Sequence, residues 1–149
     1  MTSSRPSRQT IRPARADEAA ALIAFWARAG ENDARPADTE GAIRRLLERD
    51  ADALVVAEWD ERIVGSLIVG WDGWRFHLYR LAVGPEVRRS GVAHRLIAYA
   101  EKRARQVGAG RIDAMVLEGN EQGAAFWDAA GFRPQGEWRR WIRTAPYEG

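Results

Sequence analysis

The sequence of 149 residues contains no cysteine, which excludes disulfides, thiolate metal ligands and a cysteine nucleophile. Its only lysine is Lys102, so its positive charge is almost all arginine, and the net charge is only +2. Nucleic-acid-binding domains usually concentrate basic charge on one face, so we expect no nucleic-acid partner. No apolar run approaches the ~20 residues of a membrane span, and the opening "MTSSRPSRQT" lacks the apolar core of a signal peptide. These absences predict a cytoplasmic protein with no membrane partner.

The composition is that of one ordinary globular domain. Hydrophobic residues make up 46% of the chain and charged residues 30%, a balance that allows a sizeable core without staples. We expect residues 1–9 to be a disordered polar tail and residues 10–149 to form a single domain, with no internal repeats.

The hydrophobic spacing alternates between helical and strand periods along the chain. Strand patterns around a strong Asp72-Gly73 turn signal predict an antiparallel meander over residues 53–83. A strand, a helix and a further strand then require at least one parallel pair. The fold class is therefore α/β with a mixed sheet. We predict strands at 10–15, 53–59, 63–71, 74–83, 111–118 and 137–143, and helices at 18–30, 39–49, 91–106 and 121–131.

The stretch "VRRSGVAHR", Val87 to Arg95, lies between a predicted strand and a predicted helix. The first amides of a helix lack intrahelical acceptors, and the helix dipole adds positive charge there, which makes such an end an anion site. Gly91 lets the backbone approach an anion closely, and Arg88 and Arg89 can hydrogen-bond phosphate. We therefore predict a pyrophosphate ligand, with a plain helix start and two solvated arginines as the alternative.

Neither of two familiar phosphate-binding motifs is present. The chain has no G-x-x-x-x-G-K-[ST] segment, so it is not a P-loop protein. It also has no G-x-G-x-x-G after a strand, so the dinucleotide-binding fingerprint is absent. A phosphate site in this stretch would therefore be of another kind, and the plain helix start remains the alternative.

The segment "LAVGPEVRRSGVAHRLIAYAEKRA" resembles motif A of the GNAT superfamily of N-acetyltransferases. A second segment, "NEQGAAFWDAAGF", is similar to the family's later signature, N-x-x-x-A-x-F-Y-x-x-x-G-F. Two separate signatures in the right order are far more specific than one. The residues that match are Leu81, Val83, Pro85, Arg88, Gly91 and Ala93 in the first segment, and Asn120, Ala124, Phe126, Gly131 and Phe132 in the second.

The resemblance implies a GNAT-type mixed sheet with splayed central parallel strands, helices on both faces, and acetyl-CoA as cosubstrate without a metal. The two splayed strands would be those ending at Val83 and at Glu118. The pyrophosphate would lie on the amides of the loop and helix start, and the pantetheine would pair with the strand edge as an added strand does. The residues implied in coenzyme binding are Leu81, Ala82, Val83, Arg88, Arg89, Ser90, Gly91, Val92, Ala93, Asn120 and Trp127.

The catalytic residues are less determined by the resemblance. Many members protonate the leaving thiolate with a tyrosine, but here the matching position is Trp127, whose indole is no acid in this pH range. Trp127 packing on the coenzyme, thiolate departure without an enzyme acid, and Tyr79 acting as the acid remain open. For the base that deprotonates the amine, the candidates are His77, Glu118 and an ordered water, because a histidine pKa near ~6.5 suits this step. An ordinary strand histidine and a solvated carboxylate are the alternatives.

The leading hypothesis is an N-acyltransferase that moves an acetyl group from acetyl-CoA to an amine in a ternary complex. The sequence is similar to the small single-domain members of the family, near the ribosomal-protein acetylases. The alternative is a non-catalytic acyl-CoA-binding module, which Trp127 motivates. The acceptor could be a small-molecule amine or a protein amine, and acidic Glu31 and Asp33 could attract a cationic one. Dimers are common in this family, and a strand at 138–142 would offer an edge for a homodimer.

Overall fold

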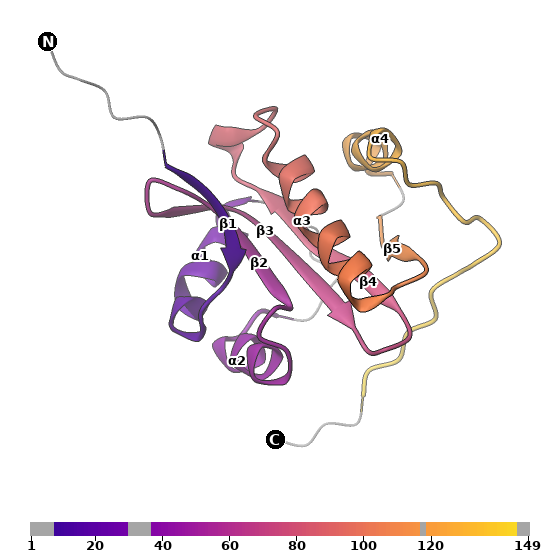
Figure 1. Cartoon of the computed structure of the whole chain (residues 1–149), viewed down its shortest axis with the longest axis horizontal. Helices are drawn as coiled ribbons and strands as arrows, with labels where there is room; N and C mark the ends of the chain where they lie inside the picture. Colours follow the sequence, from indigo (N-terminus) through magenta and orange to yellow (C-terminus); the bar gives the residue numbers. More distant parts are fainter. Residues whose placement is uncertain (1–7, 30–36, 117–118, 146–149) are drawn as a thin grey trace, which may run out of the picture. The chain divides into compact units, whose positions relative to one another are not determined.

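The computed structural model describes residues 8–29, 37–116 and 119–145. By contact density the chain divides into two compact units, residues 1–115 and 116–149. The first unit holds a sheet with flanking helices (Figure 1). Its elements are β1 (Gln9–Pro13), η1 (Ala16–Glu18), α1 (Ala19–Ala29), α2 (Glu40–Arg49), β2 (Leu54–Trp59), β3 (Arg62–Trp71), β4 (Phe76–Val83), η2 (Pro85–Val87), α3 (Val92–Val107) and β5 (Ile112–Ala114).

The five strands form one mixed sheet in the order β1-β2-β3-β4-β5. The pairs from β1 to β4 are antiparallel, and β4 pairs with β5 in parallel. The α3 helix is the crossover between the two parallel strands, as a strand–helix–strand sequence requires. The predicted mixed sheet with a parallel pair is confirmed.

Helices cover both faces of this sheet. On one face, α1 and α2 bury a core cluster that includes Leu22 and Trp26 and the alternate β2 residues Leu54 and Val56. Side chains alternate across a strand, so the β2 residues between them turn toward the other face. There α3 packs so closely that a Cβ at Gly65 would lie 2.8 Å from Val92. The same strands therefore serve two cores.

Capping residues explain where α2 begins and where α3 begins and ends. The amide of Ala42 donates to Thr39 Oγ1 at 3.1 Å, so α2 begins at Glu40 beside the predicted start. The α3 helix lies between two glycines in the left-handed region, Gly91 (φ +85°) and Gly108 (φ +78°). Few other residues take this conformation without strain.

Three strand predictions need correction. Residues 137–143 form no strand, because no neighbouring strand pairs with them in the described chain. The last strand of the sheet is short, since β5 ends at Ala114 rather than at residue 118. The β4 strand begins at Phe76 rather than Trp74, because Asp72 Oδ1 accepts the amides of Trp74 and Arg75 and closes a longer turn.

The second unit contains α4 (Glu121–Ala129) followed by residues without regular structure up to residue 145. Asn120 caps α4, because its Oδ1 accepts the amide of Gly123 at 3.0 Å. Trp127 packs edge-on against Phe132, with ring centroids 4.9 Å apart, and against Phe126 at 5.4 Å. The predicted helix is confirmed, and its aromatic residues hold the unit's own turn together.

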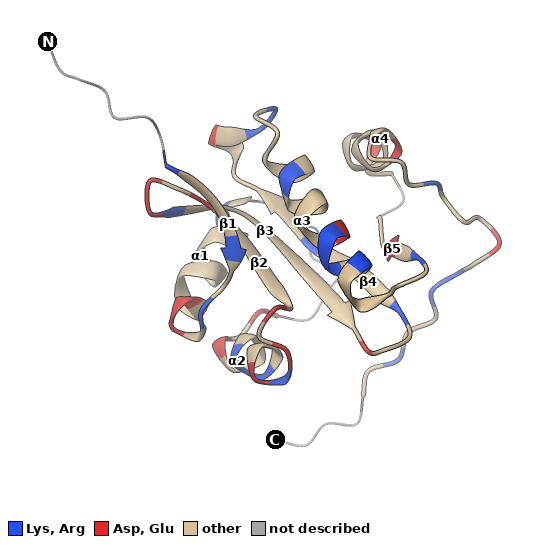
Figure 2. Cartoon of the chain, in the orientation of Figure 1, with Lys and Arg blue, Asp and Glu red and all other residues tan. Residues whose placement is uncertain are grey.

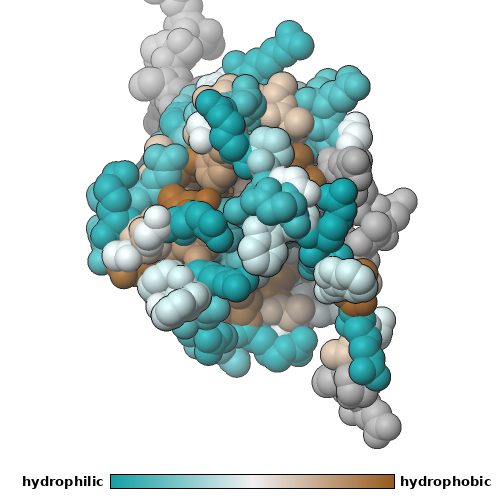
Figure 3. All heavy atoms as spheres, turned by 90° about the vertical axis from the view of Figure 1, so that its right-hand side faces the viewer, coloured by the Kyte–Doolittle hydropathy of each residue, from teal (hydrophilic) through white to brown (hydrophobic). Residues whose placement is uncertain are grey.

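On the face that Figure 3 shows, hydrophilic side chains surround areas of apolar ones. The exposed large apolar side chains of the first unit include Trp74 at 86% and Met115 at 59%. No helix in the described residues is long and apolar enough to cross a membrane.

Candidate active site

The two parallel strands pair over only three positions. Phe76 lies opposite Ile112, His77 opposite Asp113, and Leu78 opposite Ala114. Beyond Leu78, β4 continues to Val83 with no strand on that side among the described residues. An unpaired strand edge presents amide and carbonyl groups that an extended ligand can pair with. This edge includes the predicted positions Leu81, Ala82 and Val83.

A bulge interrupts β4 inside this edge. Ile68 on β3 pairs with Tyr79, but Ser66 pairs with Ala82, so β4 has one residue more than β3 between these pairs. Arg80 takes the left-handed conformation there, with φ +55°. Such a residue re-aims the neighbouring backbone groups, so the edge of β4 is locally turned out of the regular ladder.

Buried polar contacts hold the bulge in place. Ser66 Oγ accepts the indole N–H of Trp26 at 2.8 Å and donates to the carbonyl of Arg80 at 3.1 Å. The Arg80 guanidinium lies over the Trp26 ring at 4.2 Å and forms an ion pair with Asp38. Ser66 is fully buried, so these bonds are shielded from water and fix the backbone of β4 to α1.

The start of α3 presents open backbone amides at the position where the sequence predicts a phosphate site, and we call these amides the cradle. The first ladder bond of this helix runs from the Arg95 amide to the Gly91 carbonyl at 3.1 Å. The amides of Val92 and Ala93, which precede it, have no acceptor within the helix. A Cβ at Gly91 would meet no atom within 4 Å, so the space before the cradle is open. Open amides at a helix N-terminus fit a phosphate group.

The loop before α3 carries the predicted arginines (Figure 2). Arg88 donates from its guanidinium to the carbonyl of Ala29 at 3.3 Å, which ties the loop to the end of α1. Arg89 is exposed and has φ +66°. Ser90 bonds back to the carbonyl of Val87 through both its hydroxyl and its amide. Arg89 is thus left to meet a ligand with its side chain, whereas Arg88 has a structural contact.

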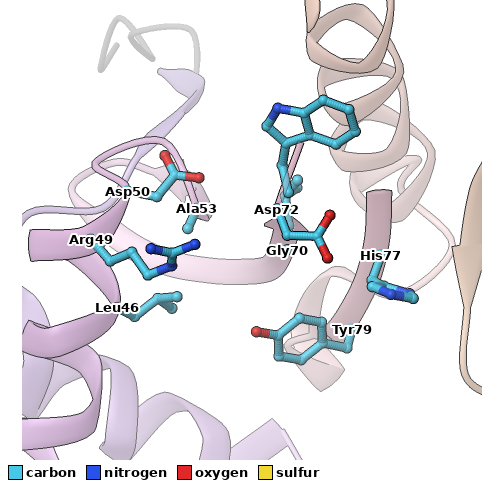
Figure 4. A pocket seen from close by; sticks show the side chains of 10 residues that line it. Leu46, Arg49, Asp50, Ala53, Gly70, Asp72, His77 and Tyr79 are labelled. Atoms are coloured by element: carbon cyan, nitrogen blue, oxygen red, sulfur yellow. The ribbon is translucent and has the colours of Figure 1, made fainter. Parts of the chain in front are cut away.

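A hollow of about 280 Å³ lies in the first unit beside β4, between the end of α2 and strands β3 and β4 (Figure 4). We call it the α2 hollow. His77 and Tyr79 form its wall on β4, and Arg49 reaches into it from α2. The residues that line it are Leu46, Arg49, Asp50, Ala53, Val69, Gly70, Trp71, Asp72, His77 and Tyr79.

His77 and Asp113 contact each other across the parallel pair. Nδ1 of His77 lies against Oδ1 of Asp113, and the two side chains are 41% and 38% exposed. A carboxylate on Nδ1 holds the imidazole in one orientation and leaves Nε2 for proton transfer. Asp113 is not among the site residues predicted from the sequence. It lies in a predicted strand, but only the register of β5 against β4 puts it opposite His77.

Tyr79 is the first β4 residue beyond the paired stretch. Its side chain lines the α2 hollow with His77, so the predicted base and the predicted acid share one wall. Partial burial raises the pKa of the Tyr79 phenol, so the phenol stays protonated at neutral pH and is a weaker acid than an exposed tyrosine. The phenol can donate a hydrogen bond at this edge.

Two of the predicted coenzyme-binding residues belong to the second unit. Asn120 and Trp127 lie in the second unit, where one caps α4 and the other packs on Phe132. Glu118, together with Glu31 and Asp33, falls outside the described residues. Among the described residues no group of three or more His, Asp or Glu side chains is placed to hold a metal ion.

Comparison with known proteins decides the family. Residues 17–132 match the model of the acetyltransferase (GNAT) family. The chain belongs to the GNAT family. A protein named an acetyltransferase in Pectobacterium atrosepticum is 40% identical to this GNAT chain over 112 residues, covering 74% of this chain and 78% of its relative. A second acetyltransferase, from Sodalis glossinidius, is 34% identical over 126 residues, covering 84% and 87%.

Solved structures show the same fold at low sequence identity. An N-acetyltransferase from Staphylococcus aureus superposes with a TM-score of 0.72 at 19% identity, covering 87% of this chain and 86% of that one. An aminoglycoside 6'-N-acetyltransferase from Acinetobacter baumannii superposes with a TM-score of 0.70 at 19% identity, covering 95% and 100%. The predicted family and fold are thereby confirmed. The chain is a GNAT acetyltransferase, and this family uses acetyl-CoA as its cosubstrate.

Proposed function

We propose that this protein transfers an acetyl group from acetyl-CoA to an amine by direct attack in a ternary complex. One observation supports it above the others: within the described residues, the edge of β4 beyond Leu78 has no strand paired to it and leads to the open amides at the start of α3. The edge and the amides suit the two parts of one ligand, an extended amide-bearing chain and a diphosphate.

In this proposal the pyrophosphate of acetyl-CoA lies on the backbone of residues 88–93, with the Arg89 side chain beside it. The pantetheine extends along Val83, Ala82 and Leu81 toward Tyr79, like an added strand. The thioester then ends near the point where β4 and β5 come together, next to His77. The wall of the α2 hollow faces the same point, so the hollow is the proposed acceptor site.

The transfer needs a deprotonated amine, whose ordinary pKa is near ~10.4. His77 Nε2 takes the proton, directly or through a water, while Asp113 holds Nδ1. The amine nitrogen forms a bond to the thioester carbonyl carbon, and a backbone amide of the β4 edge stabilises the oxygen as it gains charge. The carbon–sulfur bond then breaks, and the nitrogen, which became positively charged on attack, loses a second proton to water, so that a neutral amide forms. The thiolate leaves either as such, since a thiol pKa is near ~8.5, or with a proton from Tyr79.

Thiol release from acetyl-CoA in the presence of an amine panel tests the proposal. We expect release that depends on the amine and saturates with acetyl-CoA. A protein that is stabilised by acetyl-CoA but releases no thiol with any amine would instead be the acyl-CoA-binding module that Trp127 suggests. Amine-independent release would indicate hydrolysis and would contradict the ternary complex.

A further inference from the structure

We propose that Arg49 binds a carboxylate on the acceptor, so that the acceptor is a small amine that also carries a carboxylate group. This inference rests on the proposed acetyl transfer and names its substrate class. Arg49 is the last residue of α2, and its guanidinium reaches into the α2 hollow opposite the β4 wall (Figure 4).

Most of the charged side chains that line the hollow already have protein partners. Asp50 is neutralised, since its Oδ2 accepts from Arg103 at 2.8 Å and its Oδ1 accepts the Asp52 amide at 3.0 Å. The Asp72 carboxylate accepts two turn amides, at 2.8 and 2.7 Å, and these bonds lower its pKa. His77 is held by Asp113.

Arg49 differs from these groups. Within the described part of the chain its guanidinium has no hydrogen bond or ion pair, whereas Arg44 pairs with Glu40 and Arg103 with Asp50. A guanidinium presents a planar fork that matches a carboxylate in two parallel hydrogen bonds. Arg49 is exposed, so its hydrogen-bond donors are open to a ligand in the hollow, and the ligand group that they match is an anion.

The volume of the α2 hollow and its apolar lining fit a small acceptor. A volume of about 280 Å³ is near the lower end of small-molecule sites, which favours an acceptor of amino-acid size over a large one. Leu46, Ala53 and Val69 give the hollow apolar surface between Arg49 and the β4 wall. An apolar side chain of the acceptor can cover this surface while its carboxylate meets Arg49.

The polar side chains of the hollow lie on two opposite sides. Arg49 enters from α2, whereas His77 and Tyr79 lie on β4 across the hollow (Figure 4). A ligand held by its carboxylate at Arg49 presents its amine toward the proposed base. A polyamine would instead bring its second cation toward Arg49, and a peptide N-terminus has no carboxylate next to its amine.

The experiment compares amines that share a side chain but differ in the carboxylate. Thiol release from acetyl-CoA is measured with L-leucine, L-leucinamide and 3-methylbutylamine, and with L-phenylalanine and 2-phenylethylamine. Each is tested on the wild type, Arg49→Ala, Arg49→Lys and the control Arg45→Ala, an exposed α2 arginine that does not line the hollow. For each amine we compare kcat/KM of the wild type with that of the variant. The basicity of the amine affects both values equally, so it cancels in their ratio.

We expect Arg49→Ala to lower kcat/KM about 10- to 100-fold for the two amino acids. It should leave the amide and the simple amines within about twofold, with Arg49→Lys intermediate and Arg45→Ala unchanged. Equal losses for all amines, or no loss for the amino acids, would overturn the inference while leaving the acetyl transfer in place.

A binding measurement decides the case in which no amine is acetylated. That result would overturn the proposed function, and the inference would then depend on thermal stabilisation of the protein by L-leucine or L-phenylalanine. A shift that Arg49→Ala removes and Arg45→Ala retains supports the carboxylate site. No shift, or an equal shift in the wild type and in Arg49→Ala, overturns it.

Discussion

His77 on β4 and Asp113 on β5 lie opposite each other in the last paired stretch of two parallel strands, and Nδ1 of the histidine contacts a carboxylate oxygen of the aspartate. Beyond Leu78 and Ala114, the described residues of the two strands are no longer paired. The contact therefore marks the point at which the sheet opens. A base placed here is next to the expected position of the thioester and is oriented by its own strand neighbour.

Replacing His77 tests its role as the base. We expect His77→Ala to lower kcat/KM by about 10²- to 10⁴-fold and to remove the rise of kcat/KM with pH on the acidic side of the profile. Asp113→Asn should give a smaller loss, because the imidazole that acts as the base is still present. Glu118→Ala is the matched comparison. If Glu118→Ala removes the acidic limb and His77→Ala does not, the assignment to His77 is wrong.

The two glycines that bound α3 provide a matched pair for separating backbone strain from ligand binding. Gly91→Ala and Gly108→Ala each place a Cβ at a positive φ with no atom nearby. Each should destabilise the protein by about 1–2 kcal/mol, measured by denaturant unfolding. Only the Gly91 substitution should also weaken acetyl-CoA binding. Equal effects of both on binding would mean that Gly91 matters for the helix alone.

The buried hydroxyl of Ser66 is expected to stabilise the bulge of β4. Ser66→Ala leaves the Trp26 indole N–H without its acceptor and the Arg80 carbonyl without its donor. The free energy of unfolding should fall by about 1–3 kcal/mol. In the Trp26→Phe background, Ser66→Ala should cost less, because the indole donor is then absent. Strictly additive losses would show that the Trp26–Ser66 hydrogen bond contributes nothing.

Acid should weaken the contact between β1 and the start of α1. The hydrogen bonds from the Arg12 guanidinium to Glu18, at 2.8 Å, and then the Arg15 amide lower the pKa of Glu18 to about 2. An unfolded glutamate titrates near ~4.3. The stabilisation is therefore complete above that pH and is lost as the pH falls toward 2.

Glu18→Gln isolates this contribution. It should lower the free energy of unfolding by about 1–2 kcal/mol at pH 7, with a smaller deficit relative to the wild type at pH 3. The control is Asp17→Asn, whose carboxylate is 80% exposed and pairs loosely with Arg15 at 3.4 Å, so its effect should stay below about 0.5 kcal/mol. A deficit for Glu18→Gln that is the same at both pH values would contradict the pKa assignment.

Much of the first unit could be predicted from the sequence, because local chemistry determines it. The β4–α3 connection follows from a strand period, a glycine and a helical period, and the structure puts Gly91 at the predicted helix start in the left-handed region. The strand over 137–143 was wrong for a physical reason. The alternation of Trp138, Arg139 and their neighbours is typical of a strand, but a strand forms only where another edge pairs with it.

The missed site residues depend on register and on distant packing. Asp113 belongs to the site because of one pairing step between β4 and β5, which no local pattern contains. Arg49 looks like a basic residue in the last turn of a helix, where the dipole alone favours it. Only the packing of α2 beside β3 and β4 places its guanidinium in the hollow.

Thermal unfolding with and without acetyl-CoA, with free CoA as the comparison, tests the central claim most directly. At a ligand concentration of about 100 times Kd, binding should stabilise the wild type by about 2.7 kcal/mol and raise Tm by about 5 to 10 °C. Gly91→Trp, which fills the open space before the α3 amides, should abolish the shift. No shift for the wild type at millimolar acetyl-CoA, or an undiminished shift for Gly91→Trp, would contradict the coenzyme site described above.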